Sequence, residues 1–573
     1  MPRRSERLRT SWTLPPEMGQ YYQSLPTSFC EDSSFLMMLL EDADPRAPTS
    51  FRAALSGDAV SQWQDAIDCE ISSHIENGTW EEASLPPGRE AIGATWAFKL
   101  KTDENGNIQR YKARLCAQGF SQVRGVDYLE TYAPTSRYST LRIFITLAIM
   151  MSLSIIQMDI KTAFLYGILE EEIYMRPPQG VSVTAGKVLR LRKCIYGLKQ
   201  APRVWNENIH KLFTSLGGVN SQFDECLYIF HGDDGEIVLL NLFVDDILLA
   251  FKGVKLRDKI VTALKGAYSV VELGTPKYCL GMKFSYVRET IELSQRAAVD
   301  RFLKRFNMED CKSVSTPMDS NFKSRSRIEN SNDPEEQLTN APYRAAIGCL
   351  LYLSQCTRPD ITHAVAVLAR FGANPAERHW IAVKRIFRYL QGTKDYALVF
   401  RQPVAVPAPS NALVGFSDSS WGDDLDKRRS SGGYIFQLYG NSITWSSKLQ
   451  KCIALSSCEA EYVAIASACR EGLWMCNLLD SLQLFKDQQI VLHLFGDNQG
   501  SLKLGHNQSY HTDTKHIAIK YHFIRDQIKS GRVITQWIPT DQMVADCFTK
   551  PLPLPKLSRL IPFLNLANSL LDH

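Results

Sequence analysis

The apolar positions of the chain change their spacing several times, and each spacing predicts a different kind of element. Residues 61–77 carry apolar side chains every three or four positions and end in Asn-Gly, which predicts an amphipathic helix. Residues 94–101 and 108–115 are strand-like runs around a turn rich in Asn, Gly and acids, which predicts a β-hairpin with a basic second strand. Residues 1–60 show little periodicity, which is typical of a flexible lead-in.

The second half of the chain contains two breaks and then a change of pattern. Residues 319–340 are polar and charged and form the best candidate linker, whereas residues 343–392 have helical spacing throughout. Three prolines in residues 403–409 mark the second break. From residue 412 onward, strand-like and helical runs follow one another in an order that fits an α/β domain of about 140 residues.

Two adjacent acids interrupt the longest apolar strand-like run. Residues 237–251 read IVLLNLFVDDILLAF, in which only Asn241, Asp245 and Asp246 are polar. Adjacent carboxylates in apolar surroundings are costly, and they cannot both ionise cheaply. A hard divalent cation removes both penalties, because oxygen ligands suit magnesium and manganese. On this segment alone, a tight surface turn is an equally good interpretation, because Asp is a common turn residue.

The composition is that of a soluble globular chain and limits the other possibilities. Its 573 residues are enough for two to four domains, and 45% hydrophobic with 22% charged residues is ordinary. The net charge of +4 is small, so nucleic-acid binding would depend on local patches. The 14 cysteines show no zinc-site spacing, which indicates reduced thiols. With no signal peptide or membrane-length apolar run, we expect an intracellular protein that is not secreted and has no membrane partner.

Asp159 adds a third acid, because it lies near the end of another apolar strand-like run. An acid on one strand and an acid pair on a nearby hairpin can hold two metal ions about 3.5–4 Å apart. With these residues in view, the chain resembles the reverse transcriptases of copia-type LTR retrotransposons, from about residue 63 to residue 552. The motifs that carry the resemblance are WAFK at 96–99, RYKARL at 110–115, ETYAP at 130–134, QMDIKTAFL at 157–165, YGLKQAPR at 196–203, FVDD at 243–246 and two Leu-Gly pairs at 273–274 and 280–281.

This resemblance favours the metal site over the surface turn and implies the catalytic roles of a right-hand polymerase. Asp159, Asp245 and Asp246 would be catalytic and would bind two Mg²⁺ or Mn²⁺ ions. Phe164 would be the bulky gate that rejects the 2′-hydroxyl of a ribonucleotide. Phe243 stands where the family usually has Tyr, a change that leaves the metal ligands in place.

The resemblance also implies contacts to the nucleotide and the template. Lys112 and Arg114 match the basic fingers hairpin that grips the triphosphate of a dNTP, where cations neutralise the departing pyrophosphate. A solvated strand face is the plain alternative for both residues. Lys199 is a candidate contact to a phosphate on the template side.

A second set of acids follows residue 412, with one acid in each successive element. This pattern resembles the RNase H domain of the same retrotransposons, and two metal ions would again be held by carboxylates. The implied catalytic and metal-binding residues are Asp418, Glu461, Asp497 and Asp546. Glu461 is preferred to Glu459, because Ala-Glu-Tyr-x-Ala matches the family's helix pattern. Residues 540–544 are short and lack the His of the mobile loop found in many RNases H.

We therefore expect an α+β right-hand polymerase with fingers, palm and thumb, then a helical connection and an α/β RNase H-like domain. The expected boundaries are a flexible lead-in at 1–60, a reverse transcriptase at 61–320, a linker and connection at 321–410, an RNase H-like domain at 411–552 and a C-terminal tail at 553–573. In the connection, exposed Lys384, Arg385 and Arg388 are candidates for contacts to the backbone of a hybrid duplex.

The function that follows is RNA-directed DNA polymerisation coupled to cleavage of RNA in RNA/DNA hybrids. The expected partners are an RNA template, a DNA primer and product, RNA/DNA hybrid and dNTPs, together with other Pol or Gag products in a cytoplasmic particle, with the nucleus as a further site. One alternative is a catalytically silent, nucleic-acid-binding remnant of a retroelement. The presence of all seven acids argues against that alternative. A metal-dependent nuclease or phosphatase without polymerase activity is disfavoured by the fingers hairpin and Phe164.

Overall fold

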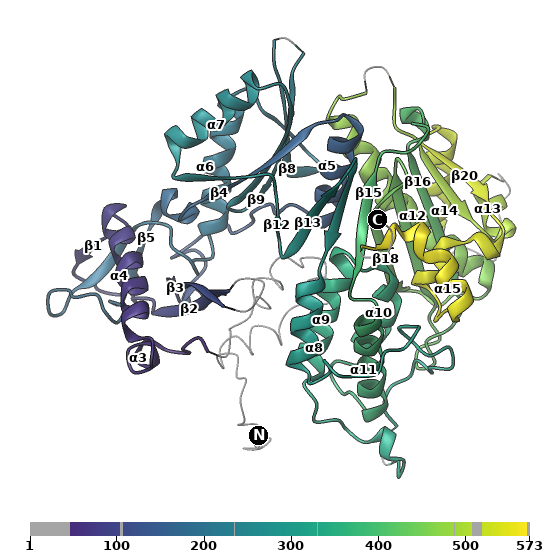
Figure 1. Cartoon of the computed structure of the whole chain (residues 1–573), viewed down its shortest axis with the longest axis horizontal. Coiled ribbons are helices and arrows are strands. Elements are labelled where there is room, and N and C mark those ends of the chain that lie inside the picture. The colour runs from purple at the N-terminus through teal and green to yellow at the C-terminus, as the bar shows by residue number, and fades with distance from the viewer. Residues whose placement is uncertain are drawn as a thin grey trace. The chain divides into compact units, whose positions relative to one another are not determined.

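Five β-sheets, connected by helices, organise the part of the chain that the structure describes (Figure 1). The computed structural model describes residues 46–102, 107–233, 235–328, 331–485, 488–506 and 518–569. Residues 42–573 form one compact unit, and most of the lead-in expected at 1–60 lies outside the described residues. None of the described helices is both long and apolar enough to cross a membrane.

The basic hairpin predicted near the N-terminus packs against the helix before it. Trp63 of α4 (Val60–Glu76) lies edge-on to Phe98 and Tyr111, with ring centroids 5.3 and 4.9 Å away. Because one ring belongs to each strand of the hairpin, this aromatic contact fixes both strands on α4. The elements of this region are α3 (Phe51–Ala54), β1 (Trp80–Ala83), β2 (Ala94–Thr102), β3 (Ile108–Ala117), β5 (Ile168–Met175) and β6 (Val188–Lys193).

A six-stranded antiparallel sheet carries the acid pair. Its strands lie in the order β11-β4-β10-β9-β8-β7, so the apolar run of residues 237–251 forms the central hairpin β9–β10. This hairpin is buried on both faces, which explains why its sequence is almost continuously apolar. The elements are α5 (Tyr138–Met150), β4 (Ser154–Ile160), α6 (Ala201–Ser215), β7 (Val219–Ser221), β8 (Asp224–His231), β9 (Ile237–Phe243), β10 (Asp246–Lys252), α7 (Lys255–Ala267) and β11 (Val270–Gly274).

A five-stranded sheet and four helices follow, and the C-terminal segment returns to this sheet. The segment after residue 552 differs from the expected tail, because β21 pairs with β15, with Leu566 opposite Leu398. Leu557, Leu560 and Leu564 are buried, so the segment is held by apolar packing. The elements are β12 (Tyr278–Cys279), β13 (Met282–Val287), β14 (Thr290–Ser294), α8 (Arg296–Arg305), α9 (Tyr343–Cys356), α10 (Thr362–Ala369), α11 (Glu377–Gly392), β15 (Tyr396–Arg401), α15 (Leu554–Leu560) and β21 (Leu566–Asn568).

The α/β domain predicted after residue 412 contains a mixed sheet in the order β18-β17-β16-β19-β20. The three strands β18, β17 and β16 are antiparallel neighbours, and β19 and β20 continue the sheet in parallel to β16. The long helix α12 packs on β16 and is capped at its N-terminus by Ser456, whose hydroxyl accepts a hydrogen bond from the Glu459 amide. The elements are β16 (Leu413–Ser420), β17 (Ser431–Leu438), β18 (Asn441–Leu449), α12 (Ser457–Ser481), β19 (Leu492–Gly496), α13 (Gln499–His506), α14 (Ala518–Lys529) and β20 (Val533–Trp537).

One buried arginine, Arg142 of α5, connects the region of the six-stranded sheet to α9 and to the α/β domain after residue 412. The Arg142 guanidinium donates hydrogen bonds to the carbonyls of Ile443, Gln355 and Cys356, and it lies 4.2 Å from the centre of the Trp445 ring. Burial lowers the pKa of Arg142 to about 10, which still leaves it charged at neutral pH. The charge is therefore stabilised by carbonyl dipoles and an aromatic face.

Replacing this arginine is expected to destabilise the protein strongly. Arg142→Met keeps the apolar stem but leaves three carbonyls without their donor, so we expect the free energy of unfolding to fall by about 3 kcal/mol. Denaturant unfolding of the full chain measures this change. Arg192→Met is the matched control, because Arg192 is exposed and its ion pair, among the residues that the structure describes, is with the exposed Glu81; its loss should cost less than about 0.5 kcal/mol. Equal stability of the two variants would refute the role of Arg142.

Candidate active sites

The first candidate site lies at the tip of the β9–β10 hairpin. Strand β10 pairs with β4 so that Asp246 is directly opposite Asp159. The turn that joins β9 to β10 consists of Val244 and Asp245. Val244 has a φ of 57°, which is unusual and strained for a β-branched residue. Trp205 stabilises the turn, because its indole Nε1–H donates a hydrogen bond of 2.7 Å to the Val244 carbonyl.

Electrostatic interactions connect these acids to the basic hairpin. Burial raises the pKa of Asp245, and the charge of Asp159 raises it further, whereas Arg114 and Lys112 lower it. The structure therefore brings Asp159 and Asp245 close enough to Lys112 and Arg114 for their charges to interact. The donors are hard carboxylate oxygens in a partly buried setting with excess negative charge, which fits Mg²⁺ or Mn²⁺.

Phe164, Tyr196 and Arg114 contact one another in sequence beside these acids. The Phe164 ring lies 4.8 Å from the Tyr196 ring at an interplanar angle of 74°, and the Arg114 guanidinium lies 4.6 Å from the centre of the same Tyr196 ring. Tyr196 thus connects the predicted gate to the predicted triphosphate contact. Tyr196 had no individual role predicted from the sequence, although the YGLKQAPR motif marks its position.

Lys199 is engaged with the chain's own backbone. Its ammonium group donates to the Gln122 carbonyl at 3.2 Å and lies 4.8 Å from the centre of the Tyr128 ring. These contacts place Lys199 beside the loop that follows β3. Its contact to a template phosphate stays a prediction.

Substitution of Trp205 tests whether its hydrogen bond to the Val244 carbonyl maintains the strained turn. Trp205→Phe keeps an aromatic ring but removes the hydrogen bond to Val244, so the turnover of the primer extension that the sequence predicts should fall about 10-fold to 100-fold. The free energy of unfolding should fall by only about 1–2 kcal/mol. Steady-state extension kinetics and denaturant unfolding measure the two effects.

Trp474→Phe is the matched control for this substitution. Trp474 also donates an indole hydrogen bond to a carbonyl, that of Phe223, at 2.9 Å, but it lies on α12. We expect extension by Trp474→Phe within about twofold of the parent. A comparable loss of turnover in both variants would show that the Trp205 effect is one of general stability.

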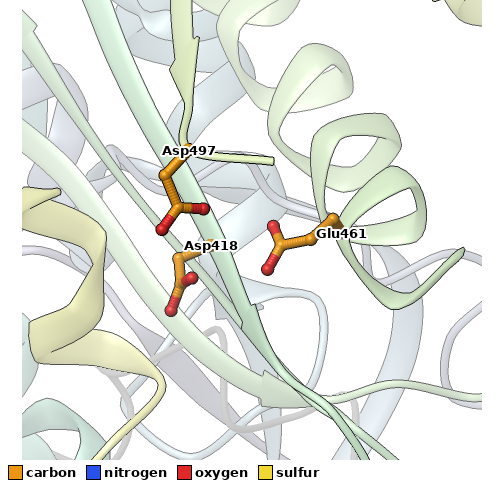
Figure 2. A group of neighbouring side chains, drawn as sticks. All are labelled: Asp418, Glu461 and Asp497. Carbon is orange, nitrogen blue, oxygen red and sulfur yellow. The ribbon is translucent and has the colours of Figure 1, made fainter. Parts of the chain in front are cut away.

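The second candidate site is formed by Asp418, Glu461 and Asp497, whose carboxylates lie close to one another (Figure 2). Asp418 comes from β16, Glu461 from α12, and Asp497 directly follows β19. One carboxylate oxygen of each lies within 4.8 Å of the others, and no other trio among the described residues meets that condition. The acids of the first site are therefore less tightly gathered than those of the second.

The three carboxylates of this trio repel one another when they are ionised. Burial raises the pKa of Glu461, and the charges of Asp418 and Asp497 raise it further. Burial is also the largest cause that raises the pKa of Asp418. A divalent cation would stabilise the ionised carboxylates, so this oxygen donor set also fits Mg²⁺ or Mn²⁺. Glu459, the alternative considered for the helix acid, instead accepts a hydrogen bond from the Leu455 amide at 2.6 Å.

Asp546 is not part of the trio. It is fully buried in a 3₁₀ turn (Val544–Phe548), and its two carboxylate oxygens form ion pairs with Lys550, at 2.6 Å, and with Lys556. Lys550 also lies 3.2 Å from Asp418. Neither lysine was predicted as a site residue from the sequence. The available signal was a lysine four residues after the predicted acid, a spacing that brings side chains together on a helical turn.

Two of the basic side chains of α11 that are candidates for duplex contacts already form hydrogen bonds with residues 312–316. Arg385 donates to the Thr316 hydroxyl at 2.9 Å, and Arg388 donates to the Lys312 carbonyl at 2.7 Å. Lys384 lies 3.9 Å from Glu377. All three basic residues line a cavity of about 600 Å³. Their contacts to a nucleic-acid backbone stay a prediction.

The sheet with its acidic hairpin, the preceding basic hairpin and the separate acid-bearing α/β domain define a right-hand polymerase joined to an RNase H-like fold. Residues 77–320 match the family described as reverse transcriptase (RNA-dependent DNA polymerase). The chain belongs to the reverse transcriptase family found in the Pol polyproteins of copia-type retrotransposons.

Two transposon proteins of related sequence agree with this assignment. The chain is 38% identical over 519 residues to the retrovirus-related Pol polyprotein from transposon TNT 1-94 of Nicotiana tabacum, covering 90% of this chain and 38% of that polyprotein. It is 31% identical over 318 residues to a transposon Ty5-1 protein of Saccharomyces cerevisiae, covering 55% of this chain and 100% of that protein. A foamy viral protease-reverse transcriptase solved with double-stranded DNA has a TM-score of 0.44 and 14% identity, over 83% of this chain and 70% of that one. The chain thus spans well under half the length of the tobacco polyprotein.

Proposed function

We propose that this chain copies retrotransposon RNA into DNA and degrades the RNA strand of the resulting RNA/DNA hybrid. The observation that carries the proposal is the register of β4 and β10, which sets Asp159 opposite Asp246, beside Asp245 and within electrostatic reach of Lys112 and Arg114. Membership of the reverse transcriptase family supports this assignment.

At the polymerase site, Asp159, Asp245 and Asp246 would hold Mg²⁺ or Mn²⁺. When bound, the metal activates the primer 3′-hydroxyl and stabilises the leaving pyrophosphate. Lys112 and Arg114 bind the triphosphate of the incoming dNTP, and the face of Tyr196 orients the Arg114 guanidinium. The Phe164 ring, braced by Tyr196, excludes the 2′-hydroxyl of a ribonucleotide.

At the nuclease site, Asp418, Glu461 and Asp497 would hold the divalent metal that activates water toward an RNA phosphodiester. The Thr540 hydroxyl donates to Asp497 at 2.8 Å, and the Ser419 amide donates to Glu461 at 3.1 Å. These hydrogen bonds orient two of the three carboxylates before substrate binds. The RNA strand is recognised through its 2′-hydroxyls and the shape of the hybrid.

Two assays on the purified full chain test the proposal. The first follows extension of an end-labelled DNA primer on an RNA template with dNTPs and Mg²⁺, and the second follows cleavage of labelled RNA in an RNA/DNA hybrid. A chelator should stop both reactions, and Mn²⁺ should restore them. A catalytically silent nucleic-acid-binding remnant would bind both substrates and convert neither. Failure of extension with either metal would refute the polymerase, and failure of cleavage would refute the nuclease.

A further inference from the structure

Lys550 places an ammonium group inside the acid cluster of the nuclease site. Its Nζ lies 2.6 Å from one oxygen of Asp546 and 3.2 and 3.3 Å from the two oxygens of Asp418. Asp418 and Asp546 are 1% and 0% exposed, whereas the Lys550 side chain is 36% exposed. A lysine that reaches in from the surface therefore bridges two buried carboxylates that belong to different elements.

The neighbouring contacts keep Asp546 turned toward lysine. Lys556 forms an ion pair with the second Asp546 oxygen and also donates to the Thr540 carbonyl at 3.2 Å. The Thr549 hydroxyl donates to Asp418 from the same short segment. Both carboxylate oxygens of Asp546 are thus occupied by ammonium groups, whereas Asp418 shares Lys550 with Asp546 and also lies within 4.8 Å of Glu461 and Asp497.

The formal charges of this cluster favour one divalent ion. Four carboxylates and two ammonium groups leave a charge of minus two when all are ionised. One divalent cation balances that charge, whereas a second would leave an excess of two positive charges in a largely buried site, at a high electrostatic cost.

We propose that the nuclease site holds a single divalent ion on Asp418, Glu461 and Asp497, and that Lys550 supplies the second positive charge. This inference rests on the proposed RNase H function and modifies the expectation of two ions at this site. Asp546 is then a positioning residue that holds Lys550, and Lys550 acts on the ion through Asp418. The Lys550 ammonium lies within 3.3 Å of both Asp418 oxygens, so it would compete there with a second ion.

Counting bound Mn²⁺ tests the inference without relying on cleavage. Free Mn²⁺ is measured by electron paramagnetic resonance while the full chain is titrated, for the parent, Lys550→Met and Lys550→Arg. Lys550→Met should bind about one more ion than the parent, because Asp418 and Asp546 lose the cation between them. Lys550→Arg keeps the charge and should match the parent. An unchanged count in Lys550→Met, or the same gain in Lys550→Arg, would overturn the inference.

Lys556→Met is the matched control. Lys556 pairs with Asp546 but has no ion pair with Asp418, so its loss leaves the bridging cation in place and should add no ion. An extra ion in this variant equal to that in Lys550→Met would mean that the lysines only screen charge, and the specific role of Lys550 would fall. Primer extension by each variant reports whether the chain remains folded.

Hybrid cleavage gives the second readout. Lys550→Met should cleave about 100-fold more slowly than the parent at limiting Mg²⁺ and recover in part at high Mn²⁺, whereas Lys550→Arg should stay within about tenfold. If the parent itself does not cleave the hybrid, the proposed function fails, but the ion count still decides the role of Lys550. A cleavage rate in Lys550→Met equal to that of the parent at every metal concentration would overturn the inference.

Discussion

Asp245→Asn is expected to reduce primer extension on an RNA template by about 1000-fold while hybrid cleavage stays within about twofold. Asparagine keeps the shape of the side chain but removes one negative charge from the cluster. That charge interacts with Asp159, Lys112 and Arg114, so its loss weakens metal binding and disturbs the balance between the acids and the basic hairpin. Single-turnover extension of a labelled primer at saturating dNTP measures the effect on chemistry.

The control for this substitution lies in the same sheet, at the end of β9 opposite to Asp245. Asp233→Asn removes an exposed acid from the loop between β8 and β9, and it should extend primers within about twofold of the parent. Both variants should retain the parent's unfolding midpoint to within a few degrees. Extension by Asp245→Asn within tenfold of the parent would remove Asp245 from the catalytic centre.

The sequence predicted the polymerase hairpin well because its information is local. A long apolar run with an acid pair near its middle favours two buried strands with the acids at the turn, and β9 and β10 are joined at that acid pair. The helical face of α11 was equally readable, since Val383, Ile386 and Phe387 are buried as its spacing predicts. The same spacing could not show that residues 312–319 occupy the polar side, where Arg385 and Arg388 hold them.

What the sequence could not predict depends on contacts between distant segments. Arg142 reads as one residue of an apolar helix, and its carbonyl partners become visible only when β18 packs on α5. The return of β21 to β15 joins strands far apart in the chain, and short strands carry little periodicity of their own. For the same reason the pattern located Asp418, Glu461 and Asp497 one by one but did not reveal that two lysines pair with Asp546 and that one of them also pairs with Asp418.

Asp497→Asn is expected to reduce hybrid cleavage by about 1000-fold and to leave primer extension within about twofold. Asp497 completes the trio with Asp418 and Glu461, and its amide analogue still accepts the Thr540 hydrogen bond but lacks the charge that attracts the metal. Cleavage of labelled RNA in a hybrid at saturating Mg²⁺ measures the loss. Asp541→Asn changes an exposed acid one residue beyond Thr540 and serves as the control, with cleavage within about twofold.

Stability in the presence and absence of metal gives an independent view of the same substitution. Asp497 raises the pKa of both Asp418 and Glu461 by repulsion, so its neutralisation should make the metal-free protein unfold at a slightly higher temperature than the parent. Ions that bind only the folded state raise the unfolding temperature, and Asp497→Asn should show a smaller rise with Mn²⁺ because one of its sites is weakened. A variant that cleaves hybrid within tenfold of the parent, or that gains as much stability from Mn²⁺, would exclude Asp497 as a metal ligand. The two measurements together separate a lost ligand from a damaged fold, since a damaged fold would lower the metal-free unfolding temperature.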